Sequence, residues 1–184
     1  MAYGVLIESK IQAKNIEALN RSAVSSTADF AGGALVVLTA PTTNGEDRWT
    51  ATVPATGSLG GLWVAYNPSV QYATVNGITL SGLLVDPRAY TNLQGKTFDV
   101  FKPQIGDEIV VTIDAVDASS SAIVAGDFLE SKDGQSKFQR IASGSGITSG
   151  STSFKVEYVT AITFPNAGIG NDAVVAYKAV CVQE

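Results

Sequence analysis

Residues 108–116 read Glu-Ile-Val-Val-Thr-Ile-Asp-Ala-Val, and this stretch decides the fold class. Ile109, Val111 and Ile113 fall on one face of an extended chain, whereas Thr112 and Asp114 fall on the other. Alternation with a period of two is typical of a strand with one buried side and one side in water. We therefore predict that this stretch is a β-strand whose sheet covers a hydrophobic core.

Similar runs recur along most of the chain. Apolar or alternating stretches occur at residues 34–39, 49–53, 62–66, 71–75, 78–84, 98–101, 122–125, 138–142, 154–163 and 173–182, with turn-forming residues between them. Asn76-Gly77 joins two of these stretches and favours a two-residue hairpin turn. Near Val159 the apolar parity breaks, which indicates either a bulge or a strand buried on both sides. Many short strands of this kind predict an all-β barrel or sandwich.

Composition supports the same class and sets the domain organisation. Apolar residues make up 45% and charged residues 16% of 184 residues, which predicts one compact folded unit. The abundance of Gly, Ser, Thr and Val over good helix formers favours strands. We expect an extended N-terminal arm at residues 1–27, a first strand-rich lobe at 28–101 and a second at 102–184.

Two segments have no clear period. The first ten residues are partly alternating and partly apolar, and we interpret them as the beginning of the arm. An ordinary first strand or a short helix packed on its own domain is the alternative, because chain ends are often tied down by docking. The glycine-rich residues 143–151 are interpreted as a mobile hairpin tip.

The net charge of the chain limits the classes of partner that we expect. A net charge of −5 and a pI near 4.7 give a surface that repels nucleic-acid phosphates and acidic lipid headgroups, so neither partner is expected. No apolar run approaches the length of a bilayer span, and we expect a soluble protein made without a secretory signal. Cys181 is the single cysteine, so no internal disulfide can form, and a reducing compartment of synthesis is expected.

The residue inventory offers little catalytic chemistry. The chain has no histidine, which excludes Ser-His-Asp and Cys-His arrangements. Cys181 lies between two valines and is interpreted as a packed hydrophobe. The glycine-rich segment lacks the Gly-Lys-Ser/Thr ending of a phosphate-binding loop. We predict no catalytic residue, no cofactor and no enzyme activity.

Acidic and aromatic residues leave weaker alternatives open. A carboxylate pair of a glycosidase could come from Asp107, Glu108, Asp114, Asp117, Asp127 and Glu130. Three of these, Asp114, Asp117 and Asp127, could hold calcium, but they lack EF-hand spacing, and no metal site is predicted. Trp49, Trp63, Tyr66 and Tyr72 could form a sugar-binding platform, although strand aromatics more often serve cores or interfaces.

Five segments together resemble a known family. The chain opens Met-Ala-Tyr-Gly and continues with Ala-Gly-Gly-Ala-Leu-Val-Val-Leu at 31–38, Leu-Trp-Val-Ala-Tyr-Asn-Pro at 62–68, Asp-Pro-Arg-Ala-Tyr-Thr-Asn at 86–92 and Ile-Gly-Asp at 105–107. This order resembles a family of small virion structural proteins encoded beside the major capsid protein in tailed phages of Gram-positive bacteria. Its members look like capsid decoration, or cement, proteins. In them the Pro-Arg-x-Tyr and Gly-Asp pieces recur at structural boundaries and form no catalytic signature.

The resemblance implies a virion protein on the outer capsid surface, synthesised in the host cytoplasm. Such a protein would bind across major capsid protein subunits and stabilise the shell, as a homo-oligomer that matches the symmetry of the lattice. An apolar N-terminal arm could add its backbone to a neighbour's sheet edge, so Val5, Leu6, Ile7 and Ile11 are candidate interface residues. Trp63 and Tyr66, outside the arm, are two further candidates, since strand aromatics often serve interfaces. A carbohydrate-binding β module and a tail structural protein are the alternative functions.

Overall fold

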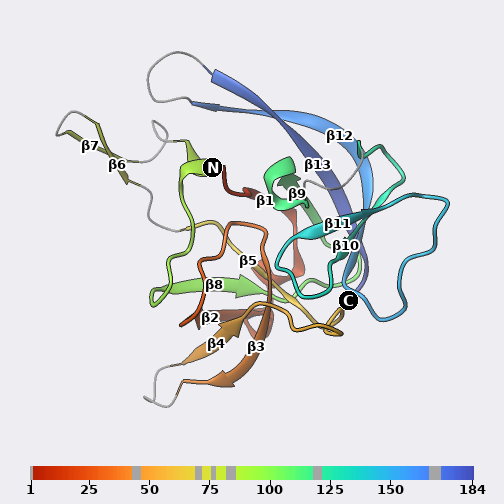
Figure 1. Cartoon of the computed structure of the whole chain (residues 1–184), viewed down its shortest axis with the longest axis horizontal. Helices are drawn as coiled ribbons and strands as arrows, with labels where there is room; N and C mark the ends of the chain where they lie inside the picture. The colour runs from red at the N-terminus through yellow and green to blue at the C-terminus, as the bar shows by residue number, and fades with distance from the viewer. Residues whose placement is uncertain are drawn as a thin grey trace.

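The computed structural model describes residues 2–42, 47–68, 72–75, 78–81, 86–117, 122–165 and 171–184 (Figure 1). The chain is all-β, as predicted, and consists of a mixed set of short strands and two long ones. Within these ranges the helices are three-residue 3₁₀ turns, namely η1 (Gln12–Lys14), η2 (Glu17–Leu19), η4 (Pro87–Ala89) and η5 (Ile113–Ala115). None of them is long or apolar enough to cross a membrane.

One half of the molecule is a six-stranded antiparallel sheet. Its strands follow the order β1 (Leu6–Lys10), β9 (Glu108–Thr112), β13 (Asn171–Gln183), β12 (Ser153–Pro165), β10 (Phe128–Ser131) and β11 (Phe138–Ile141). The two thirteen-residue strands β12 and β13 pair along nearly their whole length and extend beyond their neighbours (Figure 1).

The other half is a small closed barrel. Its strands follow the order β2 (Asn20–Val24), β4 (Arg48–Thr52), β3 (Leu35–Pro41), β5 (Trp63–Ala65) and β8 (Thr97–Phe101), and β8 closes the barrel against β2. β2 and β4 are parallel, whereas every other neighbouring pair in the barrel is antiparallel. Closure gives each of the five described barrel strands a hydrogen-bonded neighbour on both sides.

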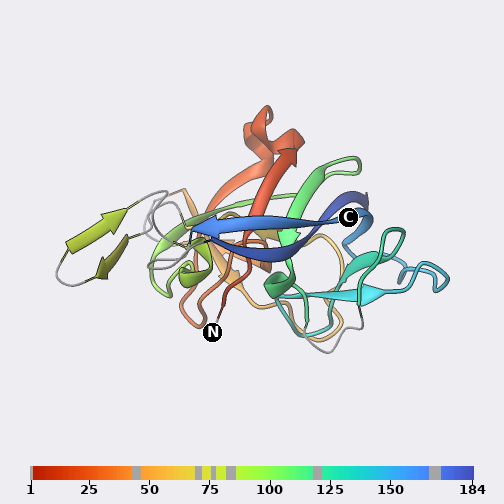
Figure 2. The same ribbon diagram turned by 90° about the horizontal axis from the view of Figure 1, so that it is seen from above.

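A separate two-stranded hairpin connects the barrel strands β5 and β8. It is formed by β6 (Tyr72–Val75) and β7 (Ile78–Ser81), and Val75 is the partner of Ile78 in the predicted register. The turn residues Asn76 and Gly77 themselves lie outside the described residues. Figures 1 and 2 show this projecting hairpin standing away from both halves.

The two halves share one hydrophobic core. Its buried members include Leu35 and Phe101 from the barrel and Leu6, Ile109 and Phe154 from the sheet. A second cluster of small and aromatic side chains, among them Phe30 and Phe98, fills the barrel. The predicted lobes are therefore two sheets packed on common side chains, and the last barrel strand ends at Phe101.

The N-terminal arm is a correction to the sequence prediction. Strand β1 pairs with β9, and strand β2 is a wall of the barrel, so residues 6–10 and 20–24 of this segment are built into the two halves. The alternative of a first strand packed on its own domain is what the structure shows. The reason is tertiary, because β1 completes its hydrogen bonds with a strand about 100 residues later in the chain, which local periodicity cannot reveal.

Three further predictions differ in detail. The alternating stretch that begins at Glu108 ends as a strand at Thr112, and Ile113 starts η5 with 46% of its surface exposed. Residues 122–125 form no strand. In β12 the register shifts between Val156 and Tyr158, so the parity break near Val159 is explained by a bulge.

Candidate functional site

A polar hollow of about 590 Å³ opens where β1, η1 and η2 meet the barrel. Four carboxylates line it, from Glu8, Glu17, Asp47 and Asp99, together with the cations of Lys14 and Arg21. Lys14 Nζ lies 3.0 Å from Glu8 Oε2, and Arg21 donates a hydrogen bond of 2.9 Å to the Asn20 carbonyl. The excess of carboxylates gives the hollow a negative field.

Tyr66 lies in the wall of this polar hollow, just after β5. Its hydroxyl donates a hydrogen bond of 2.9 Å to Asn20 Oδ1, and its ring packs against Phe101 with 5.0 Å between centroids. Burial, with the negative charges of Glu8 and Asp99 adding to it, raises the pKa of Tyr66 to about 12. The phenol is therefore protonated at neutral pH and donates its hydrogen bond to Asn20 as a neutral group.

The aromatic residues proposed as a sugar platform are not brought together. Trp63 packs against the cluster inside the barrel, whereas Tyr66 packs against the core shared with the sheet. Trp49 lies on β4, which β3 separates from β5. Tyr72 lies on the projecting hairpin. A flat exposed platform made by these residues is therefore wrong, and Tyr66 alone reaches the polar hollow.

The candidate carboxylates at the start of β9 have structural partners. Asp107 is buried and accepts hydrogen bonds from the backbone N–H groups of Gln12 and Gln104, at 2.9 and 2.8 Å. Glu108 lies between Lys10 and Lys178, at 3.0 and 2.7 Å. Hydrogen bonds from these two ammonium groups lower the pKa of Glu108 to about 2, which removes it as a general acid at neutral pH.

Two of the remaining candidates, Asp117 and Asp127, have cationic partners, whereas Asp114 lies in the 3₁₀ turn η5. Asp117 forms an ion pair with Lys132. Asp127 is buried, accepts from Arg140 Nε at 2.6 Å and accepts from two backbone N–H groups. Burial raises its pKa, but these hydrogen bonds outweigh burial and hold the pKa below the ordinary value. In the part of the chain that the structure describes, no group of three acidic or cysteine side chains is arranged to hold a metal ion.

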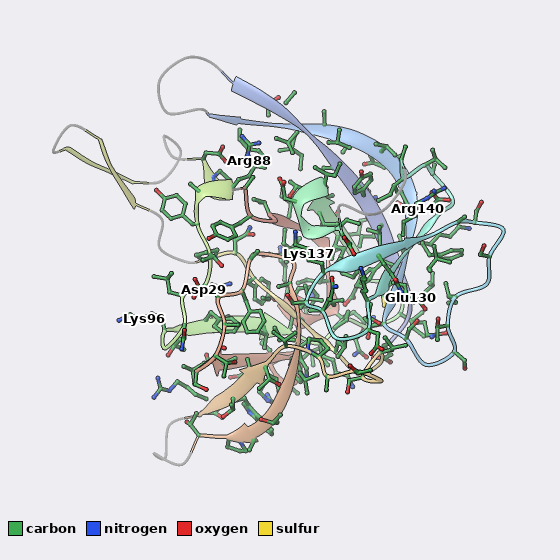
Figure 3. All side chains as sticks on the ribbon, viewed as in Figure 1. Asp29, Arg88, Lys96, Glu130, Lys137 and Arg140 are labelled. Carbon is green, nitrogen blue, oxygen red and sulfur yellow. The ribbon has the colours of Figure 1, made fainter. Side chains whose placement is uncertain are left out.

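Glu130 is a buried carboxylate that ties down the glycine-rich segment (Figure 3). Its Oε1 accepts hydrogen bonds from the Thr148 N–H at 2.7 Å and from the Ser151 hydroxyl at 2.6 Å, and Ser151 in turn contacts Ser153 at 2.7 Å. The second half of residues 143–151 is therefore anchored, contrary to a mobile tip. The composition of the glycine-rich segment does not predict this network, because the acceptor, Glu130, lies outside the segment on strand β10.

The segments that carry the family resemblance act as structural connectors. Asn67 Oδ1 accepts from the Leu6 N–H at 2.9 Å and so extends the hydrogen bonding of β1. Asp86 caps η4 through the Arg88 N–H, and its carboxylate also binds the Arg88 guanidinium, which lies over the Phe164 ring with 5.6 Å to its centroid (Figure 3). Gly106, with φ at +95°, makes the turn before β9.

The predicted interface residues divide into two groups. Val5, Leu6 and Ile11 are buried in this chain's own core at 1% to 4% exposure, so they cannot offer side chains to another protein. The interface hypothesis is wrong for these three, because their side chains pack in hydrophobic clusters of the chain itself. Ile7 points outward from β1 with 41% exposure, and Trp63 and Tyr66 are partly buried.

Two ribbons extend beyond the rest of the two halves (Figure 1). The projecting hairpin pairs with no other described strand. The part of the β12–β13 ribbon that extends beyond β9 and β10 carries the exposed side chains of Val159 and Val175, which are 43% and 42% exposed. Sequence reasoning marked both places, the first as a hairpin and the second by its parity break, but it assigned neither to an interface.

Comparison of the chain with protein-family models, curated proteins and solved structures finds no match.

Proposed function

We propose that this chain is a decoration protein of a tailed-phage capsid, which binds across major capsid protein subunits on the outer surface of the shell. The segment order described above supports the proposal through its family resemblance, and those segments serve as connectors in the fold. Such a role requires a stable body and an exposed surface for a partner. It requires no reactive group, since binding only to the assembled shell stabilises that shell by linkage.

The projecting hairpin is the observation that carries the proposal. A two-stranded hairpin alone in water is marginally stable and gains its stability from packing on a third element. β6 and β7 pair with each other and with no other described strand, and they stand away from the body (Figure 2). In our proposal the capsid surface supplies the missing packing, and the body of the molecule holds the hairpin in place.

A hairpin replacement tests this function. Residues 72–81 are exchanged for a short Gly-Ser linker, and binding to purified capsids that lack the protein is followed by cosedimentation. We expect binding to be lost while the unfolding midpoint in urea stays close to that of the native chain, because β6 and β7 pair only with each other among the described strands. Asp99→Asn, which changes the polar hollow and lies outside the candidate interface residues, is the control that should bind normally. Undiminished binding of the linker variant would refute the role of the hairpin.

Carbohydrate binding in the polar hollow is a second candidate function. The hollow brings together the Tyr66 hydroxyl, the Asn20 amide and the Asp99 carboxylate, which are groups that pair with sugar hydroxyls. Ser22 already donates to Asp99 Oδ1 at 2.9 Å, which fixes that carboxylate in place. A glycan-array signal that Asp99→Asn and Tyr66→Phe abolish would support this function, and an array without signal would remove it.

A further inference from the structure

The β12–β13 ribbon has an unpaired edge on its β12 side. Strand β10 pairs with β12 only from Ser153 to Lys155, and the loop before β10 then exchanges two backbone hydrogen bonds of 2.8 Å with Val156. Beyond Val156, β13 is the only described strand that pairs with β12. Residues 158–164 therefore form an open edge whose outward backbone N–H and C=O groups have no strand partner among the described residues.

The open edge lacks the features that normally protect such edges. It reads Tyr-Val-Thr-Ala-Ile-Thr-Phe, with no charge, no proline and no glycine over seven residues. Natural edge strands are blunted by charged side chains, proline or bulges, whereas uncharged stretches rich in β-branched and aromatic residues pair readily with other strands. The bulge at Glu157 comes before the edge, and Pro165 follows it, so neither interrupts it. Tyr158 and Val159 are exposed at 49% and 43%.

The sequence of the open edge is nearly palindromic about Ala161. An antiparallel pair of two identical edges centred there sets Tyr158 opposite Phe164, Val159 opposite Thr163 and Thr160 opposite Ile162. Each position thus meets a residue of its own kind, aromatic with aromatic and β-branched with β-branched, which are favourable cross-strand pairs. We propose that two copies of this chain pair through their open edges, about a two-fold axis at Ala161.

The charges near the open edge are compatible with a second copy of the chain as its partner. The chain carries a net charge of −5, so two copies repel each other over most of their surfaces. The seven opposed pairs contain no charged residue, and the nearest carboxylate, Glu157, is neutralised by Lys178 at 3.1 Å. Two copies can therefore meet along this edge without opposing like charges.

The size of the contact sets its strength. A stable interface buries about 800 Å² per partner, and one seven-residue edge buries less than this. The pair is therefore weak in solution and dissociates on dilution. Copies held next to each other by a larger assembly would pair far more completely, because their effective concentration is high. The inference stands independently of the proposed capsid function, since it concerns the purified chain alone.

Sedimentation of the purified protein tests the pairing. The native chain should shift from 19.1 kDa toward twice that mass as its concentration rises through the micromolar range. Ala161→Lys, which places two ammonium groups opposite each other on the axis, should remain monomeric. Ala173→Lys is the matched control: Ala173 is exposed on the same ribbon, opposite Thr163 on β13 and away from the open edge, so this variant should dimerise normally.

Cross-linking provides a second readout. Ala161→Cys should form a covalent dimer under mild oxidation with oxidised glutathione, because the two copies of this residue face each other across the axis. Ala173→Cys should not, and the native Cys181 is buried and does not compete. A native chain that stays monomeric at every concentration, or equal behaviour of the variants at positions 161 and 173, would overturn the proposal.

Discussion

Replacing Leu6 by alanine tests whether the N-terminal strand is part of the core. Leu6 is 1% exposed, lies opposite Val111 in the β1–β9 pair, and belongs to the cluster that joins the sheet to the barrel. The substitution removes three carbon atoms from this site, which costs about 2.4 kcal/mol in transfer free energy alone. Side chains from both halves hold the cavity open, so we expect a loss of about 3 to 4 kcal/mol in the free energy of unfolding.

Urea denaturation measures this loss, and the neighbouring residue provides the control. Ile7→Ala lies on the same strand but points outward with 41% exposure, so its loss should be less than half that of Leu6→Ala. We expect the Leu6 variant to unfold at a lower urea midpoint with an unchanged slope. Equal, small losses for the two variants would show that β1 is not docked in the core and would restore the hypothesis of a free arm.

Three further predictions concern a buried carboxylate, a buried thiol and a glycine with no room for a side chain. The pKa of Asp127 is lower in the folded state than in the unfolded state, so its contribution to stability is complete above the unfolded pKa of about 3.9. This contribution is lost as the pH falls through the folded-state pKa, and urea titrations in acid should show the loss. Asp127→Asn should weaken the pH dependence of the free energy of unfolding. Burial raises the pKa of Cys181 to about 12, so iodoacetamide at pH 8 should label this thiol only after unfolding. Rapid labelling of the folded chain would contradict the burial of Cys181. A Cβ on Gly60 would lie 1.9 Å from the Gly150 carbonyl oxygen, so Gly60→Ala should lower the free energy of unfolding by about 1–3 kcal/mol, as measured by thermal melting. Gly144 has open space around it, so Gly144→Ala should have almost no effect in the same measurement.

Local pattern was enough to predict the fold class and several strands. The hairpin pairing of β6 with β7, the first five residues of the stretch that begins at Glu108, and the long strand that contains Val159 all follow from period and turn chemistry. Each of these signals is carried by residues close together in the sequence. A correct prediction therefore required no knowledge of which other strand lies beside them.

The features that local pattern missed depend on contacts between distant residues. Leu6 and Val111 are 105 positions apart, so an apolar chain end could be read equally as a free arm or as a strand. Glu130 accepts hydrogen bonds from Thr148 and Ser151, which return to it from a segment that looks flexible in composition. The polar hollow likewise gathers side chains from four separated segments, and no spacing in the sequence marks them as neighbours.

Imaging of capsids with and without the protein tests the proposed function most directly. Purified shells that lack the protein are mixed with the recombinant chain, and the particles are examined by electron microscopy and by thermal melting. The account predicts saturable binding, density repeated with the symmetry of the shell on its outer surface, and a higher melting temperature of the shell. Bare shells with an unchanged melting temperature, or density confined to the tail, would contradict it.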